Sequence, residues 1–123
     1  MRAPLAIVVS ALTLAAAVPA QAAAKSFQMP SRNIVCLYRS SGGPGPLLRC
    51  DMRSLNDTAF TLDRRHRGKR VHVTDAVPAG RVLAYGSSLK LGPIKCTSRR
   101  SGLTCRNGSN HGFALSRARQ RVF

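Results

Sequence analysis

Acidic and aromatic residues are scarce in this chain, and several catalytic motifs are missing. Its 123 residues include no Trp, two Tyr, four Phe and only four acidic residues, which are all Asp. No two aspartates stand at a spacing recognisable for a paired-carboxylate mechanism. The sequence has no Cys-x-x-Cys pair of the kind that binds zinc and no Gly-x-Ser-x-Gly elbow of the kind that carries a nucleophilic serine. We therefore expect no catalytic site, no metal and no cofactor.

Long apolar runs are also absent beyond the first 18 residues. The segment from Leu5 to Val18 is almost wholly apolar, follows the positive charge of Arg2, and ends at Pro19. This run of about 14 residues is shorter than the ~20 that a membrane-spanning helix needs. The pattern is typical of a secretory signal peptide, and no Cys follows it that would carry a lipid anchor.

The cleavage signal sets the boundaries of the remaining domain. Ala20-Gln21-Ala22 has the small-x-small pattern that signal peptidase reads, and Ala24 offers a second cleavage position. We expect residues 1–22 to be a signal peptide and residues 23–123 to form a single exported domain, periplasmic or secreted. The mature form is expected to lack a transmembrane segment.

Four cysteines remain in the expected domain, and an even number in a small exported protein favours disulfides. Four cysteines allow three pairings. The competing interpretation is a zinc site completed by His72 or His111, which the missing Cys-x-x-Cys pair and the oxidising destination disfavour.

Hairpin geometry selects one of the three pairings. Cys36 and Cys50 are equidistant from a Gly- and Pro-rich turn centred near residue 43, and Cys96 and Cys105 are equidistant from the turn that follows Ser98. Residues that face each other across an antiparallel hairpin lie within disulfide range. The spacing therefore predicts the disulfides Cys36–Cys50 and Cys96–Cys105.

Short β-prone runs separated by Gly, Pro, Ser and Asn clusters make up the expected domain, and no helical period is present. This pattern predicts an all-β fold, either a small antiparallel sandwich or a barrel, with six to eight strands. Eleven segments are candidates, some of them expected to be loops: Phe27–Met29, Asn33–Arg39, Leu47–Met52, Ala59–Leu62, Arg70–Val73, Arg81–Ala84, Ser88–Leu91, Ile94–Ser98, Leu103–Arg106, Phe113–Leu115 and Arg121–Phe123. The aromatic residues expected in the core are Phe27, Tyr38, Phe60, Tyr85, Phe113 and Phe123.

Several short motifs resemble a family of small secreted bacterial cysteine-containing domains of unknown function. They are Phe27-x-Met29-Pro30-Ser31-x-Asn33-Ile34-x-Cys36, Arg49-Cys50-Asp51, Leu83-x-Tyr85-Gly86, Gly92-Pro93-x-x-Cys96-Thr97-Ser98, Gly102-x-Thr104-Cys105-x-Asn107 and His111-Gly112-Phe113-x-Leu115-Ser116-Arg117. Members of that family usually carry six cysteines, with a further pair in the middle, and residues 53–82 of this chain contain none. The resemblance implies export and a disulfide-stapled fold in which the outer four cysteines form self-contained pairs. It implies no reaction.

Basic residues, in contrast to acidic ones, are abundant in this chain. Lys and Arg number 20 and give the chain a formal net charge of +16 at pH 7. Such an excess attracts polyanions at low salt, and the planar guanidinium of Arg suits phosphate and carboxylate groups. The densest group is Arg64, Arg65, Arg67, Lys69 and Arg70; further groups are Arg99 with Arg100 at a hairpin tip, and Arg117, Arg119 and Arg121, which would project from one face if that segment is a strand.

Three interpretations of residues 64–70 compete. The segment binds anionic envelope polymers (polysaccharide or lipid headgroups), or it binds nucleic acid, or it is a solvated loop whose arginines reflect codon bias in a GC-rich genome. No aromatic residue lies within residues 61–84, so bases would find no ring to stack on, and nucleic acid is disfavoured. Anion binding by the five basic side chains is our working hypothesis.

The rival functions are a small extracytoplasmic hydrolase and a protein-interaction module. A hydrolytic triad would use Ser116, His111 and Asp51, with His111 as the base. We expect His111 instead to be a turn or strand-end residue that hydrogen-bonds the backbone near Asn107 and Gly108. Inhibition of a host lysozyme is disfavoured because such enzymes are usually cationic too, and like charges repel.

Overall fold

The computed structural model describes residues 2–13, 25–43 and 45–123. Residues 2–13 contain no helix or strand, and their side chains are exposed. The cleavage positions expected after Ala22 and Ala24 lie outside the described residues. Within them, no helix is long and apolar enough to cross a membrane.

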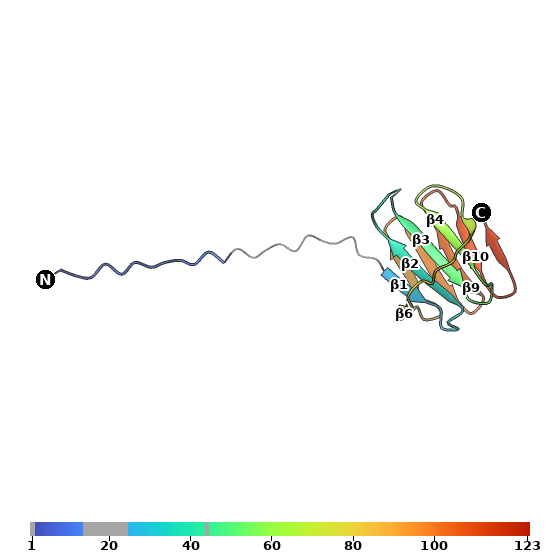
Figure 1. Cartoon of the computed structure of the whole chain (residues 1–123), viewed down its shortest axis with the longest axis horizontal. Coiled ribbons are helices and arrows are strands. Elements are labelled where there is room, and N and C mark those ends of the chain that lie inside the picture. Colours follow the sequence, from blue (N-terminus) through green and yellow to red (C-terminus); the bar gives the residue numbers. More distant parts are fainter. Residues whose placement is uncertain (1, 14–24, 44) are drawn as a thin grey trace.

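Two sheets stack face to face as a β-sandwich (Figure 1). Sheet A has the strand order β5-β4-β3-β2-β1-β6, and sheet B has the order β11-β10-β9-β8-β7. All neighbouring strands are antiparallel except β1 and β6, which are parallel. The strands are β1 Lys25–Gln28, β2 Ile34–Arg39, β3 Leu47–Met52, β4 Thr58–Asp63, β5 Lys69–His72, β6 Arg81–Val82, β7 Ser88–Leu91, β8 Ile94–Arg99, β9 Gly102–Arg106, β10 Gly112–Leu115 and β11 Gln120–Val122.

An apolar core fills the space between the sheets because inward-facing and outward-facing residues alternate along each strand. In β3, Leu48, Cys50 and Met52 are buried, while the residues between them are partly exposed. The rings of Phe60 from sheet A and Phe113 from sheet B lie with their centroids 6.1 Å apart. Burying a side chain of this size stabilises the fold by roughly 1.5–3 kcal/mol, so these facing rings help to hold the two sheets together.

Both predicted disulfides are confirmed. Cys36 pairs in register with Cys50 between β2 and β3, and Cys96 pairs with Cys105 between β8 and β9. The Cα atoms are 4.1 Å apart in each pair, and all four side chains are fully buried. One disulfide therefore joins a hairpin in each sheet. No cysteine thiol is left for the zinc site that was the competing interpretation.

The connection between β5 and β6 crosses the outer face of sheet A (Figure 1). The guanidinium of Arg49 in β3 donates hydrogen bonds of 2.9 Å to the carboxylate and to the backbone carbonyl of Asp75 in this connection. Gln28 of β1 donates to the carbonyl of Gly80 at 3.1 Å. Val77 of the connection and Val35 on the outer side of β2 are both buried. Sheet A is therefore partly covered on the side that faces away from the core.

Two expectations from the sequence are wrong, and the condition set on a third is not met. Within the described residues the sandwich has eleven strands instead of six to eight, because every β-prone run forms at least two paired residues. Tyr85 is 39% exposed instead of buried, because it lies in the turn that leads the chain into β7, and Phe123 is only partly buried. Arg117 and Arg119 precede β11 in a turn closed by hydrogen bonds between Ser116 and Arg119, so they do not share a strand face with Arg121.

Candidate functional site

The basic segment proposed to bind anions, residues 64–70, comprises the connection from β4 to β5 and the first two residues of β5, and is called the basic loop below. The side chains of Arg64, Arg65, Arg67, Lys69 and Arg70 are all exposed. Asp63 at the end of β4 shapes this loop: its Oδ1 accepts hydrogen bonds from the backbone amides of Arg65 (2.9 Å) and His66 (2.6 Å). Its Oδ2 lies 2.7 Å from Nδ1 of His66. An acidic residue that the sequence singled out for no role therefore organises the basic loop.

These contacts also set the pKa of Asp63. Burial would raise that pKa, but the hydrogen bonds from the backbone of His66 and of Arg65, and from the His66 ring, outweigh burial and lower the pKa from 3.8 to about 2. Asp63 therefore stays a carboxylate, and so a hydrogen-bond acceptor, far below neutral pH.

Asn107, which follows β9 of sheet B, also holds the loop through hydrogen bonds to its backbone. This side chain is buried at the end of β9, and its amide group donates to the carbonyls of Asp63 (3.0 Å) and His66 (2.9 Å). Its Oδ1 accepts hydrogen bonds from the backbone amides of Ser109 (3.0 Å) and His111 (3.1 Å). One buried amide thus joins the β4–β5 loop of sheet A to the β9–β10 turn of sheet B.

Further contacts place the loop beside β10 and β11. The backbone amide of Gly68 donates to the carbonyl of Phe123, and the guanidinium of Arg67 donates to the carbonyl of Val122, both at 3.2 Å. A Cβ atom on Gly68 would overlap the backbone carbonyl of Gly112, so this close approach requires glycine. The basic loop is therefore continuous with one edge of sheet B.

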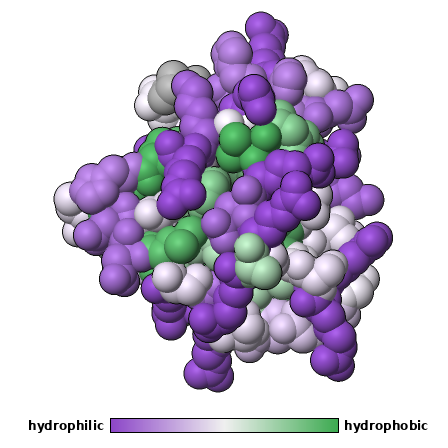
Figure 2. Space-filling view, turned by 90° about the vertical axis from the view of Figure 1, so that its right-hand side faces the viewer, coloured by the Kyte–Doolittle hydropathy of each residue, from purple (hydrophilic) through white to green (hydrophobic). Residues whose placement is uncertain are grey.

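Two arginines of sheet B lie against the ring of Phe123. The guanidinium carbons of Arg106 and Arg121 are 4.9 and 4.8 Å from its centroid, a cation–π arrangement. Gly112 lies between Arg106 and Phe123 in the sheet, and its missing side chain lets the arginine reach across β10. Hydrophilic side chains dominate this side of the molecule, and apolar ones are visible only between them (Figure 2).

Acidic residues do not balance these cations. All four aspartates lie between residues 51 and 75, and residues 76–123 contain none. Among the described residues, Arg49 is the only Lys or Arg in an ion pair, with Asp51 at 2.7 Å and Asp75 at 2.9 Å. The hydrogen bond from Arg49 lowers the pKa of the Asp75 carboxyl. The ion pairs therefore belong to sheet A and its covering segment, and sheet B carries unpaired positive charge.

The residues of the hypothetical hydrolytic triad are not brought together. His111 and Ser116 flank the two ends of β10, roughly 16 Å apart for an extended strand. Asp51 lies on sheet A, where it accepts hydrogen bonds from Arg49. The backbone of His111 accepts a hydrogen bond from the amide of Asn107 at 2.8 Å, as predicted for a turn residue. The histidine thus belongs to the turn that Asn107 organises.

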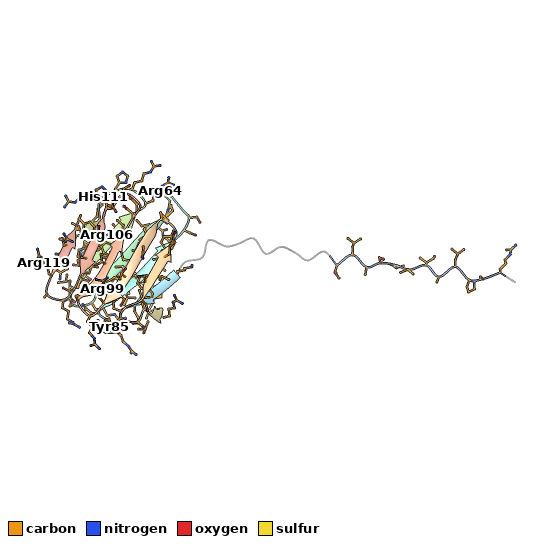
Figure 3. All side chains as sticks on the ribbon, turned by 180° about the vertical axis from the view of Figure 1, so that it is seen from behind. Arg64, Tyr85, Arg99, Arg106, His111 and Arg119 are labelled. Atoms are coloured by element: carbon orange, nitrogen blue, oxygen red, sulfur yellow. A yellow bond between two sulfur atoms is a disulfide. The ribbon has the colours of Figure 1, made fainter. Side chains whose placement is uncertain are left out.

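Sequence reasoning missed the outer face of sheet B. Figure 3 views the sandwich from this side: Arg64 and His111 are labelled at one end of the sheet, Arg99 and Tyr85 towards the other, with Arg106 between them. The signal was present in β8, where exposed Lys95 and Arg99 alternate with buried residues. Counting charges along the chain favoured the dense 64–70 run and overlooked Lys95 and Arg99, which lie four residues apart on the same face of β8.

Comparison with known proteins gives a family but no activity. Residues 46–123 match a family of unknown function, DUF6636. The chain belongs to this family. The part shared with DUF6636 spans β3 to β11, so β1, β2 and Cys36 lie outside it. No curated protein and no solved structure matches the chain. Membership of DUF6636 names no ligand, and the function has to be argued from the surface itself.

Proposed function

We propose that this protein is an exported domain that binds anionic polymers of the cell envelope through Arg64, Arg65, Arg67, Lys69 and Arg70. One observation carries the proposal: these five cations are exposed, on a loop whose backbone is held by Asp63 and Asn107 and at the start of the strand that follows it. A loop fixed before binding loses less conformational entropy when a ligand engages it than a loose loop does. Guanidinium groups form charge-assisted, bidentate hydrogen bonds with carboxylate and phosphate.

Binding rather than catalysis suits this surface. Polyanion recognition needs only accessible cations, whereas hydrolysis needs a base within hydrogen-bond reach of a nucleophile. The described residues include no group of three or more His, Cys, Asp and Glu side chains placed to hold a metal. We therefore propose a binding module rather than a hydrolase, since His111, Ser116 and Asp51 are not brought together.

Export is part of the proposal. The apolar segment from Leu5 to Val18 and the Ala20-Gln21-Ala22 pattern support a signal peptide, and the two buried disulfides suit an oxidising compartment. N-terminal sequencing of the protein recovered from outside the cytoplasm should begin at Ala23 or Lys25. Recovery of the chain only inside cells, with Met1 or Arg2 still present, would contradict export.

A salt titration tests the binding. Purified protein is titrated with an acidic polysaccharide, with anionic lipid vesicles and with DNA between about 50 and 200 mM salt. If all five cations contact the polymer, affinity should fall about 10²- to 10³-fold over this range, since each phosphate-type contact contributes about 0.7–0.9 to the log–log slope. Replacing the five residues with Gln should remove most of that slope.

The matched control removes five exposed cations elsewhere. Replacing Lys25, Arg32, Arg39, Arg53 and Arg81 with Gln changes the net charge equally, and all five are exposed on the part of the chain that forms sheet A and its turns. Equal losses in the two variants would mean that net charge alone attracts the polymer. The proposal fails if the wild-type protein binds none of the polyanions at low salt.

A further inference from the structure

We propose that the outer face of sheet B is a binding surface for a linear acidic polysaccharide, which lies across the strands from β11 to β7. This inference rests on the proposed function and gives it a ligand class and a second, larger contact surface. It uses residues that the anion-binding hypothesis for the β4–β5 loop does not include.

The residues that face outward on sheet B form two rows across the strands. Residues directly opposite each other on neighbouring strands lie side by side on the same face. The basic row is Lys90, Lys95 and Arg106 on β7, β8 and β9. The central row is Ser88, Thr97, Thr104, Ala114 and Arg121, one residue from each strand of the sheet. With strands about 4.8 Å apart, the central row is roughly 19 Å long and the basic row about 10 Å long.

Repulsion between the like charges of the basic row destabilises the free protein. Lys90 is directly opposite Lys95, and Lys95 is directly opposite Arg106. Like charges in such cross-strand pairs repel and destabilise a sheet. None of the three has an acidic partner among the described residues. Carboxylates of a bound chain would remove this repulsion, so the row has the arrangement expected of a site for a repeated anion.

Every residue of the central row lines one of three adjoining depressions, together called the hollow below. Two shallow depressions, of about 380 and 330 Å³, share Ser101, Gly102 and Thr104. A third, of about 460 Å³, shares Arg106 with the second and extends to Lys90 and Lys95. Small side chains and glycine keep the floor low, and the cations stand along its sides. The hollow therefore suits an extended chain better than a compact molecule.

Two cations beside the hollow are held in place before any ligand arrives. Arg106 and Arg121 both rest on the ring of Phe123, which limits the positions their guanidinium groups take. Restricting a flexible side chain in the free state lowers the entropy lost on binding. The basic loop adjoins the same ring through the hydrogen bond from Gly68 to the Phe123 carbonyl, so one polymer can contact both surfaces.

The two faces of the sandwich differ in accessibility. On sheet A the connection between β5 and β6 covers part of the outer face, and Arg49 there is already neutralised by Asp51 and Asp75. Along the strands of sheet B, Thr97, Thr104 and Ala114 stay partly exposed. The face without acidic residues is therefore also the face that a polymer can reach.

The side chains of this face favour a glycan over nucleic acid or a membrane. Threonine and serine hydroxyls both donate and accept hydrogen bonds, as sugar hydroxyls require, while the cations meet carboxylates. The ring of Phe123 is already contacted by two guanidinium groups, which would compete with bases for stacking on it. A membrane is disfavoured because the exposed large apolar side chains that the structure describes beyond residue 13, Val82 and Tyr85, both lie outside β7–β11.

The first test couples stability to binding. Lys95→Gln removes both like-charge pairs of the basic row, so we expect the melting temperature of the free protein to rise by roughly 2–5 °C. The same substitution should weaken binding of alginate fragments, a linear polyuronate. Arg39→Gln is the control, because Arg39 is an exposed strand residue opposite Leu47 and has no cationic cross-strand partner. A melting temperature and an affinity that both stay unchanged in Lys95→Gln would overturn the proposal.

The second test compares three triple variants that remove equal charge. They change Lys95, Arg106 and Arg121 on the proposed face, Arg64, Arg65 and Lys69 in the basic loop, and Arg39, Arg53 and Arg81 on sheet A, each to Gln. We expect the first variant to lose at least about tenfold in alginate affinity and about two units of log–log salt slope, with the third little changed. Thr104→Phe, which fills the hollow without changing charge, should weaken alginate binding as well.

The outcomes separate this inference from the proposed function. If the loop variant loses alginate binding while the sheet B variant and Thr104→Phe keep it, the face is not the site and the proposed function stands. If the wild-type protein binds no polyanion at low salt, both fail. If oligo(dT) or phosphatidylglycerol vesicles bind this face more tightly than alginate does, the glycan assignment is wrong.

Discussion

The buried amide of Asn107 offers the sharpest test of how the basic loop is held. Its side chain makes four hydrogen bonds, two to the carbonyls of Asp63 and His66 and two from the amides of Ser109 and His111. Asn107→Ala removes all four. At about 1 kcal/mol net for each hydrogen bond, with part of the loss recovered where water reaches the freed groups, we expect a destabilisation of about 3–4 kcal/mol. That is a large share of the 5–15 kcal/mol typical of a folded domain.

Urea unfolding followed by circular dichroism measures this loss. With an m-value of about 1–1.5 kcal/mol/M, the midpoint should fall by about 2–4 M urea while m stays unchanged. Asn56→Ala is the matched control, because Asn56 is exposed and its side chain makes no hydrogen bond in the structure. That control should stay within about 0.5 kcal/mol of the wild type.

The same variant should also loosen the loop. Hydrogen exchange at the backbone amides of Arg65, His66 and Gly68 should quicken in Asn107→Ala more than exchange in β2 and β3 does, because the substitution removes the contact between the loop and sheet B. A midpoint within 0.5 M urea (about 0.5–0.75 kcal/mol) of the wild type, or uniform exchange changes across both sheets, would refute the role we assign to Asn107.

Three further predictions concern the disulfides, the acid at the start of the loop and its close-packed glycine. Replacing Cys96 and Cys105 together with Ala should cost about 2.5–3 kcal/mol, as the chain-entropy model gives for a sequence separation of 9, and thermal unfolding should show a fall in melting temperature. The carboxylate of Asp63 has a pKa lowered from 3.8 to about 2 in the folded protein, so its stabilising contribution is complete above about pH 4 and disappears as the pH falls through about 2. The stability difference between wild type and Asp63→Asn should therefore shrink over that range, and a constant difference would contradict the linkage. Gly68→Ala should destabilise by about 1–3 kcal/mol in urea titrations because its Cβ meets a backbone carbonyl, whereas Gly43→Ala, with open space around it, should be near neutral.

Local patterns in the sequence determined the strands and the disulfides. Each cysteine pair stands symmetrically about a turn, and the position and length of the turn set the register of a hairpin, so Cys36–Cys50 and Cys96–Cys105 were predictable without a structure. The β-prone runs were likewise placed to within a few residues. The number of strands was underestimated, since short runs such as Arg81–Val82 become strands only when another strand is present to pair with.

Long-range contacts decided which side chains are exposed and which of them meet at the surface. The amide of Asn107 reaches carbonyls 44 and 41 residues away, and no local motif announces such a hydrogen bond. Tyr85 is a large aromatic residue of the kind expected in a core, but it is exposed in a turn. Burial depends on how the two sheets pack against each other, which the local sequence does not show. Arg49 also became an ion-pair centre only through a segment that folds back across sheet A.

The excess of basic residues is a property of the sequence alone, and so is the absence of acids after residue 75. Where that charge gathers is a property of the tertiary structure. The register of three neighbouring strands places Lys90, Lys95 and Arg106 side by side, and the packing of Phe123 holds the arginine there. Composition fixes how much charge a chain carries, whereas pairing between strands fixes which charges meet, because side chains distant along the chain become neighbours only through backbone hydrogen bonds across the sheet.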